Sequence, residues 1–167
     1  QWLRWRADKI TQFKKRLFDE IKQRKQDCIM GLSPNPQRFS YEEFLADWES
    51  WERQGLVEEL VVQIYRNDIN VFMAELDREE MQNARKHIPV SVGLLAGLKG
   101  KPVSMEQIQE QLATVRNKGY AGVSFFFYES MWNWAPTSPE ERQAAFGALF
   151  PETIAAPDLT KGWEPEK

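Results

Sequence analysis

A serine, a glycine 15 positions later and an apolar segment occur together twice in this chain of 167 residues. The first copy runs from Ser40 through Gly55 to residues 60–65, and the second from Ser104 through Gly119 to residues 123–129. Serine with Glu or Gln three residues later is a helix N-terminal signal, and glycine commonly follows a helix C-terminus. Each copy therefore predicts a capped helix that leads into a buried strand.

Helical and apolar segments alternate along the whole chain. The apolar residues Ile10, Phe13, Leu17 and Ile21 predict a first helix over residues 3–25 that packs through this stripe. Strands are expected over residues 28–32, 60–65, 88–95 and 122–128, and the helices between them over residues 41–53, 77–86 and 104–118. A last helix is expected after Ser138. We predict one domain over residues 1–150 and an extended or disordered tail over residues 151–167.

Near-continuous apolar strands that alternate with amphipathic helices predict an α/β fold with a parallel sheet covered by helices. One architecture that fits is a run of four βα units from a (β/α)8 TIM barrel, with all helices outside. The alternative is a small doubly wound sheet with helices on both faces. The two copies lie 64 residues apart, which spans two βα units. Since barrel interiors are layered by alternate strands, this spacing favours the barrel.

Composition excludes several classes of function. The chain has one cysteine, Cys28, and one histidine, His87, so an internal disulfide and a paired-histidine zinc motif are both excluded. No glycine-rich phosphate motif is present, and we expect neither a cofactor nor a metal. No apolar segment is long enough to span a bilayer. The first 25 residues carry nine Lys or Arg and three acidic residues, but no second basic patch accompanies them, so we expect no nucleic-acid partner.

Ligands of parallel α/β proteins bind in the loops that follow the strands, and this rule selects the candidate site. Glu129 follows an apolar strand and is the candidate general acid, with Asp68 as its partner carboxylate; a capping role for Asp68 is the alternative. Aromatic and amide side chains suit a polyol substrate. The expected substrate-binding residues are Gln63, Tyr65, Asn35, Tyr128, Trp132 and Trp134. His87 falls at the opposite end, which indicates a structural role.

Three segments resemble a known family: Ser33-Pro34, the stretch from Trp51 to Tyr65 with Gln63-Ile64-Tyr65 as its sharpest part, and residues 122–129. Together they are similar to the C-terminal half of the bacterial glycosyl hydrolase-like family 10 proteins, over most of residues 1–150. Val62 and Arg66 differ from the residues usual in that family. The resemblance implies strands five to eight of a TIM barrel, whose missing half supplies further acidic site residues.

The expected function is therefore that of a fragment of a glycoside hydrolase acting on a polysaccharide such as a cell-wall glycan. One carboxylate cannot serve both steps of hydrolysis, so the fragment alone should be inactive or nearly so. The alternative is a non-catalytic carbohydrate-binding or scaffolding domain. Because the end strands of a half barrel are open edges, we expect the missing N-terminal half or a second copy as partner. The cellular location stays open; a parent acting on cell-wall glycan would be exported or associated with the envelope.

Overall fold

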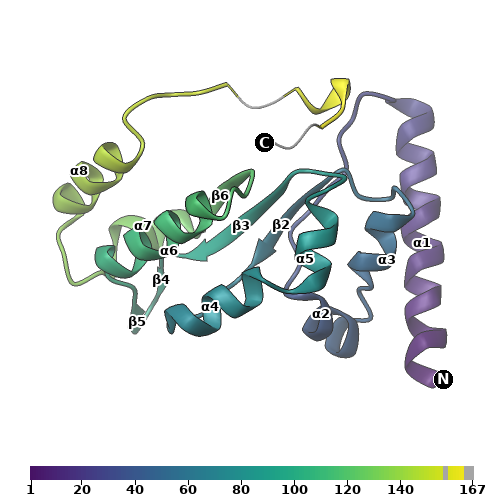
Figure 1. Cartoon of the computed structure of the whole chain (residues 1–167), viewed down its shortest axis with the longest axis horizontal. Helices are drawn as coiled ribbons and strands as arrows, with labels where there is room; N and C mark the ends of the chain where they lie inside the picture. Colours follow the sequence, from purple (N-terminus) through teal and green to yellow (C-terminus); the bar gives the residue numbers. More distant parts are fainter. Residues whose placement is uncertain (156–157, 164–167) are drawn as a thin grey trace.

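The computed structural model of this protein describes residues 1–155 and 158–163 (Figure 1). Helices and strands alternate through most of the chain. The helices are α1 (Trp2–Arg24), α2 (Gln37–Phe44), α3 (Trp48–Arg53), α4 (Ile69–Leu76), α5 (Glu79–Ala84), α6 (Met105–Asn117), α7 (Tyr128–Trp132), α8 (Pro139–Leu149) and the short 3₁₀ helix η1 (Leu159–Lys161). The strands are β1 (Gly31–Leu32), β2 (Glu59–Gln63), β3 (Val90–Leu95), β4 (Gly97–Leu98), β5 (Lys101–Pro102) and β6 (Gly122–Phe126).

Four strands form one parallel sheet in the order β1-β2-β3-β6, and β4 and β5 form a separate antiparallel pair. Apart from that pair, neighbours in the sheet are also successive strands in the chain. A doubly wound sheet reverses its strand order to place helices on both faces, and the described strands contain no such reversal. With right-handed crossovers, a sequential order carries the connecting helices to the same face. The parallel α/β class is confirmed.

The core lies on the helix-covered face of the sheet. Alternate residues of β2 and β3 are fully buried there, namely Leu60, Val62, Val90, Val92 and Leu94. They pack with buried helical side chains such as Trp48, Phe72 and Leu112. The other face carries the alternate residues Glu59, Val61, Gln63, Ser91, Gly93 and Ser124, which we call the open face. Most of these side chains are half-buried, and Ser124 is exposed.

Helix α1 has the expected length but turns a different side to the core. Its packed side carries Ala7, Lys14 and Phe18, and burial lowers the pKa of Lys14. The stripe expected to pack is largely exposed; the side chain of Phe13, for example, is 63% exposed. Together with the exposed rings near the N-terminus it forms one surface, which we call the α1 strip: Trp2, Trp5, Ile10, Phe13 and Leu17. The predicted packing face was therefore wrong.

The first copy of the repeat does not form one capped helix. Residues 37–53 form two helices separated at Leu45, which is in the left-handed conformation with φ of 60°. Ser40 lies inside α2, where its hydroxyl donates to the Asn35 carbonyl at 2.8 Å. In the second copy Ser104 caps α6 as predicted, by accepting from the Gln107 N–H. The prediction was wrong for Ser40 and is confirmed for Ser104.

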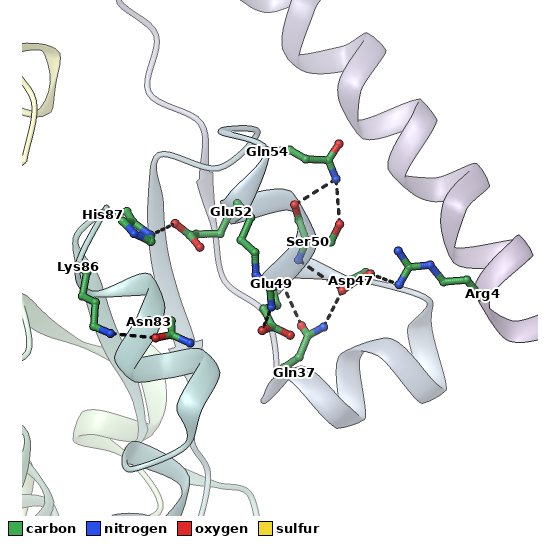
Figure 2. A network of polar contacts seen from close by, with 11 residues as sticks. Arg4, Gln37, Asp47, Glu49, Ser50, Glu52, Gln54, Asn83, Lys86 and His87 are labelled. Carbon is green, nitrogen blue, oxygen red and sulfur yellow. Dashed lines mark hydrogen bonds and ion pairs between the residues drawn. The ribbon is translucent and has the colours of Figure 1, made fainter.

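Asp47 supplies the cap that Ser40 was expected to give (Figure 2). Its carboxylate accepts from the Ser50 N–H at the start of α3, from Gln37 of α2 at 2.8 Å and from Arg4 of α1 at 3.4 Å. One carboxylate therefore joins three helices. Nearby, the buried Glu52 contacts the imidazole of His87 at 2.9 Å, before the start of β3. This position agrees with the structural role expected for His87.

Two further local expectations were wrong. The helix expected over residues 77–86 begins later, with α5 at Glu79, because Asp77 ends α4 and pairs with Lys118 at 2.6 Å. The strand expected to continue to residue 128 ends at Phe126, and the next residues form α7. Ser138 caps α8 together with Glu141, as predicted. Residues 156–157 and 164–167 of the predicted tail lie outside the described part.

Candidate functional site

The predicted site residues follow the carboxyl ends of three strands of the parallel sheet, β1, β2 and β6. Asn35 comes after β1, the segment from Tyr65 to Asp68 comes after β2, and α7 follows directly on β6. Parallel strands that are adjacent in a sheet end at the same edge, so these segments share one end of the molecule. Their individual settings at this edge differ, as follows.

Four aromatic side chains form a continuous group at this edge, which we call the aromatic rim: Tyr65, Phe126, Phe127 and Trp134. Tyr65 stacks on Phe126 with ring centroids 5.8 Å apart, which joins the ends of β2 and β6 across β3. Phe127 lies 5.1 Å from Phe126 and 5.9 Å from Trp134. Phe126 is 48% exposed and Trp134 is 39% exposed, so the rim presents ring surface to solvent.

Two members of the rim have unusual properties: Tyr65 has a raised pKa, and Trp134 has a left-handed backbone conformation. Partial burial raises the pKa of the Tyr65 hydroxyl above its usual value, which keeps it protonated and able to donate. Trp134 has a φ of 64°, a left-handed conformation that costs a non-glycine residue about 1–2 kcal/mol. Conformations of this kind occur at ligand-binding loops and also at helix ends, as at Leu45 after α2. The rim therefore combines exposed rings with a protonated hydroxyl at the carboxyl edge of the sheet.

Gln63 lies at the end of β2, just below the rim. Its amide nitrogen donates to the Ser33 carbonyl at 2.8 Å and to the Ser33 hydroxyl at 3.3 Å. The backbone at the end of β2 is bonded to the same loop, since the Gln63 N–H donates to the carbonyl of Pro34, the residue after Ser33, at 2.8 Å. The side chain is thus fixed against the loop that follows β1.

Asn35 supports the loop after β1 through its backbone. Its carbonyl accepts from the Ser40 hydroxyl at 2.8 Å and from the Trp48 indole at 3.0 Å. The Asn35 side chain is half-buried. These bonds tie the loop to α2 and α3, and a contact of Asn35 with substrate stays a prediction.

The two candidate carboxylates have different settings. Asp68 is the N-cap of α4, where one oxygen accepts from the N–H groups of Asn70 at 2.8 Å and Val71 at 3.0 Å. Glu129 lies in the first turn of α7 and is exposed. The apolar surroundings expected for Glu129 are therefore missing, because the chain turns into a helix where the strand was expected to continue. Asp68 has the capping role that the sequence also allowed.

The remaining aromatic candidates separate into different groups. Trp132, the last residue of α7, packs edge-on against Phe146 with ring centroids 5.7 Å apart. Both rings belong to an apolar cluster that is separate from the main core. Tyr128 is exposed and meets Trp132 at 6.1 Å. Trp134 instead joins the aromatic rim. Trp132 therefore contributes to packing, whereas Tyr128 and Trp134 offer surface to a ligand.

Arg142 is a supporting residue that the sequence did not single out. It is fully buried in α8 and donates to three backbone carbonyls: Met131 in α7, Val103 at 3.2 Å and Ala96 at 3.4 Å. Desolvation lowers its pKa. The residue holds α7 against the segment that follows β3. A lone arginine on the polar side of a predicted helix gives no sequence signal for such a role.

Arg66, which directly follows Tyr65 of the rim, also lines a pocket. This pocket of about 230 Å³ opens between α2 and the segments around α4 and α5, where Arg66 pairs with Glu75 at 2.9 Å. Within residues 1–155 and 158–163 no group of three or more His, Cys, Asp or Glu residues is arranged to hold a metal ion. In the same part of the chain, none of the helices combines the length and apolar character needed to cross a bilayer.

Fold and site together define a parallel α/β protein with an aromatic surface at the carboxyl edge of its sheet. Residues 1–114 match the model of the family described as glycosyl hydrolase-like 10. The chain belongs to the glycosyl hydrolase-like 10 family, and the resemblance seen in the sequence is confirmed over these residues. No curated protein matches the chain. The match includes Gln63 and Tyr65, whereas β6 and α7 follow it, so the roles of Phe126, Glu129 and Trp134 rest on geometry.

Proposed function

We propose that this chain is the C-terminal half of a glycoside-hydrolase-like (β/α)8 barrel and that it binds a polysaccharide at the carboxyl edge of its sheet. The observation that carries this proposal is the aromatic rim beside the fixed amide of Gln63. Sugar rings present C–H groups on their faces and hydroxyls around their edges. Aromatic rings suit the faces, and an oriented amide suits the hydroxyls.

Strand order supports the barrel half. Four parallel strands in sequential order, with their core on the helix side, are what successive units of a barrel provide. The open face would then be part of the barrel interior. Its carboxyl end carries the rim, the end at which barrel enzymes bind their substrates.

Hydrolysis by this chain alone is not supported by the carboxylates. Glycoside hydrolysis needs two carboxyl groups with different roles, and one of them must stay protonated at working pH. Asp68 accepts two backbone N–H bonds, and Glu129 is exposed. We therefore propose that catalysis, where it occurs, uses Glu129 together with an acidic residue outside this chain. A cell-wall glycan is the proposed substrate.

The α1 strip supports the proposal of a protein partner. Five large apolar side chains are exposed along one side of α1, and β1 has only β2 as a neighbour in the sheet. In a continuing barrel the strand before α1 would pair with β1, and the helix before that strand would cover the α1 strip. In the chain alone a second copy would cover it instead.

Carbohydrate binding can be tested by isothermal titration of the chain with β-1,4-linked hexasaccharides of N-acetylglucosamine and of glucose. We expect Trp134→Ala to weaken binding about tenfold, because a loss of about 1.4 kcal/mol of ring contact has that effect. Tyr65→Phe keeps the ring and tests the hydroxyl. Trp2→Ala is the matched control, because Trp2 lies in α1 and not in the aromatic rim. This variant should bind as the unaltered chain does.

Glu129→Gln separates the two candidate functions. If the chain only binds carbohydrate, Glu129→Gln leaves its affinity unchanged. Any turnover by the full-length protein is then unchanged as well. In a hydrolase the full-length variant loses turnover while the chain still binds sugar. Equal affinity of the unaltered chain and Trp134→Ala would contradict the proposed site.

A further inference from the structure

The amide of Gln63 is held in one orientation. Its nitrogen donates to the backbone carbonyl of Ser33 at 2.8 Å. A carbonyl can only accept, so the amide nitrogen and not the amide oxygen must face Ser33. The oxygen of Gln63 is then the atom available to a donor from outside, and none of the hydrogen bonds among the described residues uses it.

Gly93 lies beside Gln63 on the open face, where its backbone is buried. The two residues are partners in the β2–β3 register. A Cβ at Gly93 would lie 3.3 Å from the Gln63 Cα and 3.6 Å from its Cγ, so any side chain there would stand against that of Gln63. Because Gly93 has no side chain, this stretch of β3 places none beside the fixed amide.

Ser124 borders this stretch on its other side. It is the register partner of Gly93 in β6, and its neighbours Val123 and Phe125 pack on the core. Ser124 therefore faces the open side, where it is exposed. The Cα atoms of Gln63 and Ser124 are two strand spacings apart, roughly 9.6 Å. A hydroxyl that can donate and accept thus lies opposite an amide oxygen that accepts.

The aromatic rim lies directly above this row. Tyr65 follows Gln63 by two residues and Phe126 follows Ser124 by two, so each ring is on the same face as the polar group below it. The two rings stack at 5.8 Å. Polar groups beside an apolar ring surface provide both kinds of contact that a sugar ring makes.

We propose that Gln63, Gly93 and Ser124 form the floor of a subsite for one sugar ring of the bound glycan. The Gln63 amide oxygen accepts from one sugar hydroxyl, and the Ser124 hydroxyl bonds a second one. Gly93 lies between them in the sheet and adds no side chain there, beneath Tyr65 and Phe126. This inference rests on the proposed carbohydrate binding and adds Gly93 and Ser124 to the site.

Ser124 gives the sharpest test, because its hydroxyl makes no hydrogen bond within the described part of the chain and its replacement should leave the fold intact. The chain is titrated with the same two hexasaccharides. Ser124→Leu fills the floor and should weaken binding at least about tenfold. Ser124→Ala removes only the hydroxyl and should weaken it about threefold to tenfold, the range expected for one hydrogen bond. Thermal unfolding checks that each variant is folded.

Two controls make the result specific. Ser91→Ala removes a hydroxyl from the same open face, two residues below Gly93, and Thr153→Leu adds bulk at an exposed site outside the sheet. Both should bind as the unaltered chain does. Suppose that the chain binds sugar and that Trp134→Ala weakens this binding. If either Ser124 variant then binds as tightly as the unaltered chain, the subsite is refuted and the proposed function stands. If the unaltered chain binds neither hexasaccharide, both fall.

Discussion

Replacing Arg142 by methionine should destabilise the segment that carries α7. The guanidinium is fully buried and donates to the carbonyls of Met131, Val103 and Ala96. Methionine has a similar length and fills much of the same space, so the main loss is polar. The three carbonyls would remain buried with their donor removed.

The expected size of the effect follows from these bonds. A buried carbonyl left without its donor costs about 1–3 kcal/mol, which gives roughly 3–9 kcal/mol for three. Part of this is recovered, because desolvation lowers the pKa of Arg142 and the variant no longer buries a charge. The bond to Ala96 is long, at 3.4 Å, and contributes at the low end. We expect a net loss of about 3 kcal/mol.

Urea unfolding followed by tryptophan fluorescence measures this loss. Arg38→Met is the matched control, since Arg38 is exposed and pairs with Glu42 on the surface of α2, and it should change stability by less than about 0.5 kcal/mol. Hydrogen exchange should show lost protection in α7 while β2 stays protected. An Arg142→Met chain as stable as the unaltered one would refute the idea that this arginine holds α7 in place.

Three further outcomes are expected. Phe13→Glu should weaken self-association of the chain about tenfold or more by light scattering, because it places a charge in the α1 strip; an unaltered chain that stays monomeric would contradict this. Burial raises the pKa of Tyr120 to about 12, so the folded chain keeps a proton that the unfolded chain loses near pH 10. Stability should therefore fall by up to about 2.7 kcal/mol from pH 10 to 12, a fall that Tyr120→Phe should lack in alkaline unfolding curves. Asp68→Ala should cost about 1 kcal/mol in urea unfolding through its lost cap, whereas Glu129→Ala should cost almost nothing.

Periodicity located the helices better than it located their packed faces. Helix α1 was expected over residues 3–25 and is found at Trp2–Arg24. Its packed side holds Ala7, Lys14 and Phe18, while Phe13 is exposed. An apolar stripe indicates the side of a helix that gains from burial, but it does not identify the surface that packs on that side. The packed side of α1 carries a small residue and long side chains, which hydropathy alone does not mark.

The two serines of the repeat show how context overrides a local motif. Ser40 and Ser104 have the same spacing to a later glycine, and only Ser104 caps a helix. Two prolines precede Ser40, and a helix begins directly after the second of them, at Gln37. Pro36 lacks the N–H that a helix start leaves unpaired, which favours a start there. Asp47 then caps the next helix, because its carboxylate reaches the Ser50 N–H.

The edge of the sheet that carries the candidate site could be predicted from the sequence, whereas the surroundings of its candidate carboxylates could not. The rule that ligands bind after parallel strands selected Gln63, Tyr65 and Trp134, which the structure places at or near one edge. Glu129 was expected to leave an apolar strand. Because the strand ends at Phe126 and α7 begins at Tyr128, Glu129 lies on an exposed helix turn. A shift of two residues in a strand end was enough to change the environment of that carboxyl group.

Two surfaces of the chain are uncovered, and their chemistry differs. The open face carries polar or small residues, Gln63, Gly93 and Ser124, just below the aromatic rim, whereas the α1 strip consists of large apolar side chains. Apolar side chains gain from burial by protein, and polar groups with unused bonding capacity gain from water or a polar ligand. A partner should therefore pack on the α1 strip and leave the end of the open face accessible. The proposed barrel meets both conditions, because strands added beyond β1 bring a helix onto α1 and curve around the open face without filling its carboxyl end. A flat pairing of two open faces would bury Ser124 and Gln63, so protection of those residues on self-association would argue against the barrel arrangement.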